Sequence, residues 1–502
     1  MRLRGLVLAL TVGIGHVLVT NLRVGVTSKP QQRVSAVEMN LADFSSPNQT
    51  LQKGRRRRQR RGVGRRGSKQ GNETTTRVQE PAQSPNTPKD NNNNNNTKAD
   101  NKQDWIRWRN LVLNMKRQGE NKLRLSEMQE DYRKCALDQP HPRPNHACYF
   151  SNQTKIPYCH IQMLRIDVSR IDCSAGGEDL ESVMGRKESL EVPKYNKGAL
   201  STPERILLPE GVLQKRTFYV KDFVHSVDIQ DLPCVEIRSR PTLFVQRYEY
   251  ANLFHTLLDW WSAFFVMPAH EGTVDVVFLD GHARGNLDSV WSHLWGNVVY
   301  LKQLAEGGVC FENAVLVPSG HSSVLWPRER NLPRVCIAMM NAFERFFVEG
   351  YGLQGVSLEW GRITIIDRRP YVAHPRGKSG GEPQRILTNL DELKVRLEQE
   401  TNATLVEVIR LEHMSFQEQL TVLRKTHIVI ANHGAALSFL VFMSKGAHVL
   451  EFEAPASHFF GTLAGWKPHV TRTLLPSAPG PLLTESLMAE SVLPTVRVIL
   501  SL

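Results

Sequence analysis

Short apolar runs separated by polar turns dominate the chain from residue 242 onward. In the first part of this region, Thr242–Val245, Val274–Leu279 and Ala314–Val317 have the length and composition of buried strands. A longer, strongly apolar segment from about Asn252 to Met267 follows the first of these runs and predicts a helix. The pattern therefore predicts strand–helix units rather than an all-helical or all-strand fold.

The same alternation is clearer toward the C-terminus. Ser415 and Glu418 form an S-x-x-E capping box that marks a helix beginning. Strands that alternate with helices indicate a parallel sheet covered on both faces, so we expect an α/β protein with two Rossmann-like domains that face a cleft. The strands are predicted over Ile363–Ile366, Leu405–Ile409, His427–Ile430 and His448–Phe452. The helices are predicted over Asp391–Glu398, Ser415–Lys425 and Ala435–Met443.

The first 22 residues carry a membrane signal. Arg2 and Arg4 precede an apolar run over residues 5–22, which is near the lower limit of about 18 residues for a spanning helix. Arg23 stands where a small-residue cleavage site would be expected. The pattern predicts a cytoplasmic tail over 1–4 and a signal-anchor transmembrane helix over 5–22, with the bulk of the chain in the secretory lumen. A cleaved signal peptide is the alternative.

Residues 23–104 lack the apolar content of a folded domain. They include the run Asn91–Asn96, and Phe44 is their single aromatic residue from position 29 to 104. Such a segment cannot bury enough apolar surface to offset its ordering entropy, so we expect a disordered basic and Asn-rich stem. Ten basic residues and no acidic one lie from Lys53 to Lys69, which accounts for most of the net charge of +13. A basic folded surface for nucleic acid is therefore not required, and Arg55–Arg61 is interpreted as a charged linker.

The remaining chain is divided into a first domain over 105–350, which includes a cysteine-containing extension, and a second domain over 351–502. None of the seven cysteines has a C-x-x-C or zinc-type spacing, so in an oxidising lumen some are expected to form disulfides, especially the four from Cys135 to Cys173. Candidate N-glycosylation sites, each of the form Asn-x-Ser/Thr, occur at Asn48, Asn72, Asn95, Asn152 and Asn402.

The turn and helix after the Thr242–Val245 strand carry the first set of chemical residues. Residues beyond the carboxyl end of such a strand face the ligand crevice, and Glu249 and Asn252 lie there. His255 and Asp259 are four residues apart and share one helix face, and a carboxylate beside an imidazole suits a general base. The competing interpretation is a structural His–Asp pair among core aromatic residues. No third ligand or D-x-D motif accompanies the pair, so no metal site is predicted.

The second set follows the predicted strand at 427–430. His433 and Gly434 form a turn that opens a helix, where backbone N–H groups and the positive helix end suit a phosphate. Glu451, at the end of the next strand, is expected to accept ribose hydroxyls. The alternative for a lone His-Gly turn is packing, but the combination with upstream arginines is more specific, because guanidinium groups suit a diphosphate. These arginines are Arg368, Arg369, Arg376 and Arg385.

Four motifs in this order resemble glycosyltransferase family 61. They are TLFVQRYEYANLFHTLLDWWSA at 242–263, FLDGH at 278–282, RPYVAHPR at 369–376 and HGA at 433–435. The resemblance extends from about 242 to 470. It implies a Golgi type II membrane protein of GT-B-like fold, an inverting enzyme that transfers xylose from UDP-xylose in β-1,2 linkage to the core β-mannose of N-glycans on glycoproteins. It implies no obligatory metal or other cofactor and no nucleic-acid partner.

The resemblance also assigns roles to residues. His255 and Asp259 match the family's F-H-x-x-x-D element. Apart from the resemblance, His255 is the leading catalytic base, because it lies in the first turns of a helix that follows a strand and its unperturbed pKa of about 6.5 suits a base near neutral pH. Glu249 and Asp259 are its rivals. Ala436 departs from the second glycine of H-G-A-G, and Asp367 replaces a small or apolar residue. The donor-binding residues it implies, in the second domain, are Arg369, Arg385, His433, Gly434, Ala435 and Glu451. The acceptor-binding residues that we predict in the first domain, from their place on the turn and helix rather than from the resemblance, are Asn252, Trp260 and Trp261.

Three other functions remain open. Another family 61 transferase would use UDP-GlcNAc or UDP-arabinose. The differences from the family pattern at Asp367 and Ala436 bear on this choice of donor. A non-catalytic glycan-binding relative would use Trp260 and Trp261 as a sugar platform. A nucleic-acid- or matrix-binding protein would act through Arg55–Arg61.

Overall fold

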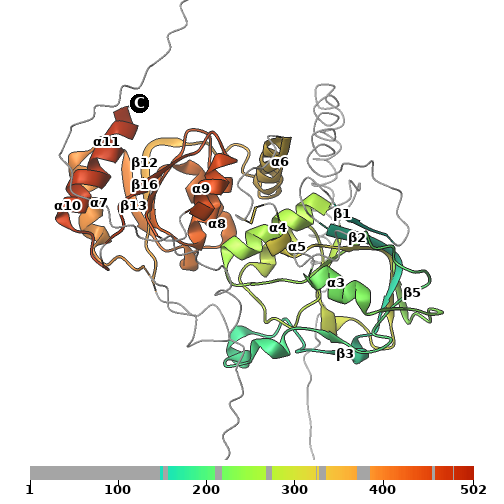
Figure 1. Cartoon of the computed structure of the whole chain (residues 1–502). Coiled ribbons are helices and arrows are strands. Elements are labelled where there is room, and N and C mark those ends of the chain that lie inside the picture. Colours follow the sequence, from blue (N-terminus) through green and yellow to red (C-terminus); the bar gives the residue numbers. More distant parts are fainter. Residues whose placement is uncertain are drawn as a thin grey trace, which may run out of the picture. The chain divides into compact units, whose positions relative to one another are not determined.

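The computed structural model describes residues 147–150, 157–209, 218–266, 274–323, 325–326, 335–369, 385–454, 458–478 and 480–501 (Figure 1). All of these residues belong to one compact unit that runs from Asp90 to Leu502. The predicted anchor, the predicted stem and Cys135 lie outside the described residues. Within the described residues, no helix is both long and apolar enough to cross a membrane.

Strands and helices alternate along most of the described chain. The strands are β1 Ala147–Phe150, β2 Pro157–Ile166, β3 Ile171–Asp172, β4 Lys194–Tyr195, β5 Leu200–Thr202, β6 Val227–Ile229, β7 Glu236–Arg238, β8 Thr242–Val245, β9 Asp275–Phe278, β10 Val298–Tyr300, β11 Val309–Leu316, β12 Glu359–Ile366, β13 Leu405–Ile409, β14 Thr426–Asn432, β15 His448–Phe452 and β16 Thr471–Leu475. The α-helices are α3 Phe218–His225, α4 Leu253–Val266, α5 Asp288–Leu294, α6 Val335–Gly350, α7 Leu390–Glu400, α8 Phe416–Lys425, α9 His458–Gly465, α10 Glu485–Leu487 and α11 Leu493–Ser501. Two 3-10 helices matter for the site, η7 Gly320–Ser322 and η9 Ala435–Val441.

The first sheet is mixed. Its order is β10-β9-β8-β11-β2-β5-β6, with β1 beside β2 and β7 beside β11. Strands β8, β9 and β10 pair in parallel, and β11 is parallel to β8. Strand β2, in contrast, is antiparallel to both β11 and β5. The expected Rossmann-like arrangement therefore holds only for the β8–β11 part. It is wrong around β2, because the segment before residue 220, whose apolar pattern Pro and Gly interrupt, supplies an antiparallel strand.

The second sheet is entirely parallel, as predicted for this half. Its order is β13-β12-β14-β15-β16. The chain runs outward from β12 through α7 to β13 and returns through α8 to β14, on the other side of β12. This reversal creates a topological switch point between β12 and β14, and ligands of such sheets bind beyond the carboxyl ends of the strands at this point.

Helices cover both faces of the second sheet. Figure 1 shows α7, α10 and α11 on one side and α8 and α9 on the other. Leu393 of α7 and Val496 of α11 share one core cluster with Ile365 of β12. Leu420 of α8 and Phe439 of η9 belong to a second cluster, which also contains side chains of α4 and α6. This second cluster joins the helices of the two sheets into one core.

Local patterns gave reliable element bounds. Strands β8, β13 and β15 have the predicted bounds, and α4 differs from its prediction by one residue at each end. The capping box is confirmed, because Ser415 Oγ accepts the N–H of Glu418 at 3.3 Å and Glu418 Oε2 accepts the N–H of Ser415 at 2.7 Å. The helix predicted over 435–443 is the shorter 3-10 helix η9 instead.

Two disulfides lie in the first sheet. Cys148 and Cys159 are paired across β1 and β2, which agrees with the expectation of bridges between Cys135 and Cys173. Cys234 and Cys310 form a second bridge that the sequence did not indicate. Cys173 is a free thiol. Asn402 is exposed, and the other four candidate glycosylation sites lie outside the described residues.

Candidate active site

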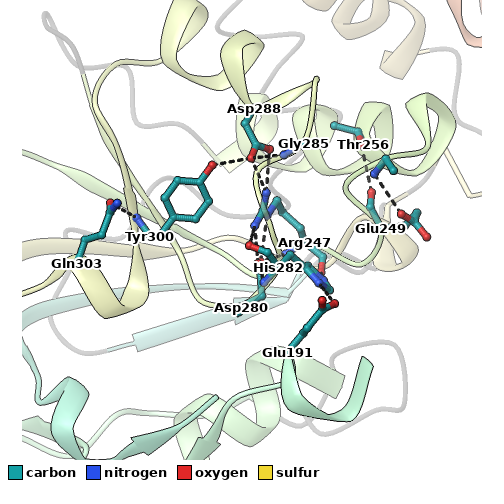
Figure 2. A network of polar contacts seen from close by, with 12 residues as sticks. Glu191, Arg247, Glu249, Thr256, Asp280, His282, Gly285, Asp288, Tyr300 and Gln303 are labelled. Carbon is teal, nitrogen blue, oxygen red and sulfur yellow. Dashed lines mark hydrogen bonds and ion pairs between the residues drawn. The ribbon is translucent and has the colours of Figure 1, made fainter. Parts of the chain in front are cut away.

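A buried ion-pair network fixes the turn after β8. Arg247 is 1% exposed, and its guanidinium lies 2.6 Å from Asp280 and 2.8 Å from Asp288 (Figure 2). Burial alone would lower the pKa of Arg247, but the two carboxylates outweigh it and raise that pKa. Asp280 follows β9, so the network joins the carboxyl ends of two neighbouring parallel strands. It thereby holds the turn that carries Glu249.

His282 belongs to this frame. Its Nδ1 lies 2.7 Å from Glu191 Oε2, and its Nε2 lies 3.2 Å from the carbonyl oxygen of Arg247. Glu191 is fully buried and also pairs with Arg186. Both ring nitrogens of His282 are therefore engaged inside the protein, which leaves none for a substrate.

Glu249 and Asn252 lie on the turn between β8 and α4. Glu249 Oε1 accepts the N–H of Ala251 at 3.1 Å, and its carbonyl oxygen accepts the hydroxyl of Thr256 at 3.2 Å. Asn252 Oδ1 accepts the N–H of Phe254 at 2.9 Å, which caps the beginning of α4. The acceptor contact assigned to Asn252 stays a prediction, and Glu249 remains half-buried beside the helix that carries His255.

His255 forms a pair with a second histidine. Its Nδ1 lies 3.2 Å from Nε2 of His321, which η7 places beyond the carboxyl end of β11. Burial lowers the pKa of His255, and the negative charge of Glu249 offsets only part of this effect. His255 is therefore neutral at neutral pH, as a general base requires. No motif or periodic pattern in the sequence points to His321, because its partner lies 66 residues away.

Asp259 does not orient His255 directly, which corrects the role inferred from their spacing. Among the described residues no hydrogen bond joins the two side chains, and Asp259 Oδ1 instead accepts the N–H of Gly320 at 2.7 Å. Asp259 is 1% exposed, and burial raises its pKa to about 7 despite this hydrogen bond. A Cβ on Gly320 would lie 2.5 Å from Asp259 Oδ1 and 2.8 Å from Leu258 Cβ, so only glycine permits this approach. Asp259 thus anchors the turn that carries His321.

Aromatic rings surround the histidine pair. The ring centroid of Tyr248 lies 3.6 Å from that of His321 and 5.3 Å from that of His255. Trp326 stacks on His321 at 4.2 Å. Tyr248 is 39% exposed, so this ring offers an apolar surface beside the imidazoles.

Trp260 and Trp261 do not offer such a surface, and their assignment to acceptor binding is corrected. Both side chains are 0% exposed. Trp260 packs 5.3 Å from Phe347, and Trp261 packs 5.3 Å from Phe343, both on α6. A sugar cannot stack on a fully buried indole. Truncating either side chain would instead cost about 3–5 kcal/mol of stability.

The second cluster lies at the switch point of the parallel sheet. His433 follows β14, and its Nδ1 lies 2.7 Å from Oε1 of Glu451, in β15. Arg472 Nε donates to Glu451 Oε2 at 2.6 Å, and Glu451 is fully buried. Glu451 is thus engaged on both oxygens and orients His433, which corrects its predicted contact with ribose. This carboxylate fixes the Nδ1–H of His433 and leaves the Nε2 edge for a ligand.

Gly434 makes room for a guanidinium. Its φ of 172° is extended and needs no glycine, but a Cβ there would lie 2.4 Å from Nη1 of Arg368. That nitrogen donates to the carbonyl oxygen of His433 at 3.2 Å. Ala435 begins η9 directly afterwards. The turn therefore brings Arg368 and the backbone of His433 and Gly434 together at the end of β14.

Further arginines lie beyond the carboxyl end of β12, the strand next to β14. Asp367 Oδ2 accepts from Arg369 at 2.9 Å and from Arg410 at 3.0 Å. The carboxylate that stands here in place of the family's small or apolar residue therefore fixes two guanidinium groups near the end of β12. Arg385 is exposed, has a left-handed φ of 65°, and its carbonyl oxygen accepts from Asn432 at 2.6 Å. Arg376 lies outside the described residues. The arrangement is suited to an anionic group.

A chain of aromatic contacts connects the two histidine clusters. The ring centroid of Phe254 lies 5.6 Å from that of His255 and 5.7 Å from that of Phe460. Phe460 in turn lies 5.1 Å from His433. Two phenylalanine rings therefore separate the imidazoles of the first and second clusters.

A cavity lies apart from the two histidine clusters, and no cluster of metal ligands is found in the described part of the chain. No group of three or more His, Cys, Asp or Glu side chains there is placed to hold a metal ion. A cavity of about 420 Å³ is lined by residues of β2, β6 and adjacent loops, including Met163, Ile229 and Asp231. It contains no residue of either histidine cluster.

Residues 253–450 match the family model described as Glycosyltransferase 61. This segment begins at the first residue of α4 and ends in β15. It therefore contains His255, Asp259, His321 and His433 together with the turns that hold them.

Curated proteins of similar sequence include two plant enzymes. The chain is 29% identical over 366 residues to beta-1,2-xylosyltransferase RCN11 of Oryza sativa subsp. japonica, covering 64% of this chain and 68% of that protein. It is 28% identical over 408 residues to the beta-1,2-xylosyltransferase of Arabidopsis thaliana, covering 64% and 74%. It is 24% identical over 242 residues to the EGF domain-specific O-linked N-acetylglucosamine transferase of Gallus gallus, covering 44% and 42%.

A solved structure of a rubredoxin oxygen:oxidoreductase from Desulfovibrio gigas aligns with 43% of this chain and 49% of its own. Its TM-score is 0.21 and its identity 9%, which is too weak a similarity to bear on the fold.

Proposed function

The chain carries a glycosyltransferase family 61 domain and is a UDP-sugar glycosyltransferase, and we propose that it transfers xylose from UDP-xylose in β-1,2 linkage to the core β-mannose of N-glycans. The sequence similarity to two plant beta-1,2-xylosyltransferases supports this donor and this linkage. The architecture we propose is GT-B-like, with the acceptor on the first sheet, the donor on the second, and a cleft between them.

One structural observation carries the proposal. A neutral imidazole, His255, and a cationic strand-end site around His433 are joined by only two aromatic rings, Phe254 and Phe460. An inverting transfer needs a base on the acceptor side and charge stabilisation at the departing diphosphate on the opposite side. The two clusters supply these two functions from different sheets.

The donor side stabilises the leaving group. Arg369 and Arg385 contribute positive charge beyond β12, and the backbone around Gly434 lies at the end of β14. His433, oriented by Glu451, presents Nε2 to the diphosphate. As the bond between the anomeric carbon and the diphosphate breaks, its electron pair leaves with UDP, and these groups balance the charge.

The acceptor side activates the nucleophile. His255 takes the proton of the mannose 2-hydroxyl while that oxygen forms its bond to the anomeric carbon from the face opposite the diphosphate. Tyr248 replaces the two buried tryptophans as the apolar surface for the acceptor, because its ring is exposed beside His255. Glu249 remains the rival base from the turn before α4.

Mass spectrometry of a defined N-glycan tests the proposal. The full chain is incubated with the glycan and with UDP-xylose, UDP-arabinose or UDP-GlcNAc in separate reactions. We expect the glycan to gain one pentose with UDP-xylose alone. The product should resist mannosidase, and a β-xylosidase should remove the added pentose. Transfer from UDP-GlcNAc instead would favour a family 61 transferase that uses this donor, and UDP binding without transfer from any donor would contradict an active enzyme.

The location of the protein is part of the same proposal. We place it in the Golgi membrane as a single-pass type II protein, with residues 105–502 in the lumen. Asn402 is exposed after α7, so a luminal chain should carry an endoglycosidase-sensitive glycan there. An unmodified Asn402 in the secretory membrane fraction, with the glycan also absent at the other four acceptors, would contradict a luminal orientation.

A further inference from the structure

We infer that His321 is a positioning residue for the base: its Nε2 accepts a hydrogen bond from Nδ1–H of His255 and so keeps the lone pair of His255 on Nε2. The inference rests on the proposed function in one respect, the identification of His255 as the base. His321 follows β11 and lies outside the four family-like motifs at 242–263, 278–282, 369–376 and 433–435.

The hydrogen bond between the two imidazoles has one direction that permits catalysis. The donor in a neutral pair carries its proton at the shared bond, and the acceptor carries its proton on the far nitrogen. If His321 donated, His255 would hold its proton on Nε2 and have no lone pair for the mannose hydroxyl. With His255 as donor, Nε2 is unprotonated and can act as the base.

The protein holds His321 for this task from three sides. The N–H of Gly320, the preceding residue, donates to buried Asp259 at 2.7 Å. The rings of Tyr248 and Trp326 lie 3.6 and 4.2 Å from the imidazole of His321. Asp259 therefore supports the turn that carries His321 and makes no hydrogen bond to His255 among the described residues.

A histidine partner differs from a carboxylate partner in charge. In the described part of the chain, the titratable groups that contact His255 or act on its charge are Glu249 and Tyr248 on the preceding turn and His321 on η7. A carboxylate at this distance would stabilise the imidazolium form of His255 by its negative charge, whereas the neutral imidazole of His321, 3.2 Å away, carries no such charge. His255 thus remains neutral, and available as a base, over a wider pH range than it would beside a carboxylate.

The proton transfer balances without a further reactant. The mannose 2-hydroxyl gives its proton to Nε2 of His255 and its oxygen bonds to the anomeric carbon, while UDP leaves with the electron pair. His255 becomes an imidazolium whose Nδ1–H still donates to neutral His321. The proton then passes from Nε2 to water when the product leaves.

Three substitutions of His321 test the inference, because the new side chains differ in how far a hydrogen-bond acceptor stands from Cα. The amide oxygen of Gln stands the same number of bonds from Cα as Nε2 of histidine, whereas that of Asn is one bond shorter. We expect His321→Gln to retain kcat within about threefold, and His321→Asn and His321→Ala to lower kcat by about 10- to 100-fold. The KM for UDP-xylose should stay constant in all three.

His293→Gln is the matched control. His293 Nε2–H donates to the carbonyl oxygen of Gly350 at 3.0 Å on an exposed surface, outside both histidine clusters. This variant should have the kcat of the wild type. Equal kcat values for the Gln and Asn variants, or an unchanged kcat in His321→Ala with a normal thermal transition, would overturn the inference.

An NMR titration separates failure of the inference from failure of the proposed function. The Cε1–H signal of His255, identified by its loss in His255→Gln, should titrate in two steps in the wild type and in one step in His321→Gln, because two coupled imidazoles interact by about 1 pKa unit or more. A single step in both proteins refutes the pair. Two steps in a protein that transfers no sugar would refute the proposed function alone.

Discussion

The protein places a histidine beyond a strand end in each of its two sheets, but gives the two histidines different partners. His255 is paired with a neutral imidazole, and His433 with a carboxylate that is itself paired with Arg472. Both partners bind Nδ1 and leave Nε2 as the edge that can meet a substrate. The charge of the partner is what differs.

That difference suits two roles in one reaction. A carboxylate behind His433 balances positive charge, so this imidazole can face a diphosphate among arginines. A neutral partner and burial favour an uncharged His255, as a base must be before it takes a proton. The same residue type at equivalent strand ends is thus specialised by what contacts its other nitrogen.

Removing the imidazole of the first site should have the largest effect. His255→Ala should lower kcat by about 10²–10⁴, with little change in UDP affinity, because only the base is lost. In the wild type the acidic limb of kcat/KM should have its midpoint below about pH 6.5, since burial lowers the pKa of His255. Initial rates across pH and calorimetry with UDP measure both.

Glu249→Gln tests whether Glu249, rather than His255, is the general base. If His255→Ala turned over nearly normally while Glu249→Gln were inactive with UDP binding intact, Glu249 would be the base. The comparison between the two histidines would then fail at the first site, and His255 would be structural.

Asp259→Asn tests the support beneath the first site. The folded pKa of Asp259 is about 7, above the unfolded value of about 3.9, so its contribution to stability is present below about pH 4 and lost as pH rises to about 7. Asn keeps an oxygen for the N–H of Gly320 but has no proton to lose, so the variant does not lose this stability as the pH rises. The free energy of unfolding of the variant relative to wild type should therefore rise by a few kcal/mol from pH 4 to pH 8, at about 1.4 kcal/mol per pKa unit.

Urea unfolding at several pH values measures this difference. Parallel stability curves for the variant and the wild type would mean that Asp259 is charged in the folded protein across this range. His321→Gln should not alter the slope between pH 4 and 8 in the same way, because it leaves Asp259 in place.

Arg385→Ala probes the second site. A charge-assisted contact with phosphate is worth about 1.5–3 kcal/mol, so the KM for UDP-xylose should rise roughly ten- to a hundredfold while the acceptor KM stays constant. Arg385→Asn is the companion variant, because Asn adopts the left-handed φ of 65° found at this position more readily than Ala does. A rise in the acceptor KM alone would move Arg385 to the other side of the reaction.

The sequence predicted what local patterns encode. The bounds of β8, β13 and β15, the Ser415 capping box and the parallel second sheet all follow from apolar runs and cap residues a few positions apart. The same patterns placed His255 at the beginning of a helix and His433 on a turn after a strand, where the structure has them.

What the sequence missed depends on long-range contacts. His321 meets His255 across 66 positions, and Glu451 is buried by contacts that its place at a strand end does not reveal. Trp260 and Trp261 were read as a sugar platform, but α6 covers them, and α6 was not predicted. The antiparallel strand β2 was missed for the related reason that its partners lie far along the chain.

The smallest expected effect concerns the exposed ring beside the first histidine. Tyr248→Ala should raise the acceptor KM about fivefold with donor KM and kcat nearly unchanged, because covering about 50 Å² of apolar ring is worth about 1 kcal/mol. Tyr248→Phe keeps the ring and should behave as the wild type. Trp360→Ala is the control, since Trp360 is also exposed but lies at the amino end of β12, where no acceptor contact is proposed. An unchanged acceptor KM in Tyr248→Ala would show that the acceptor approaches His255 from another side. A fall in kcat with the acceptor KM unchanged would instead show that Tyr248 acts on the imidazole pair and not on the sugar.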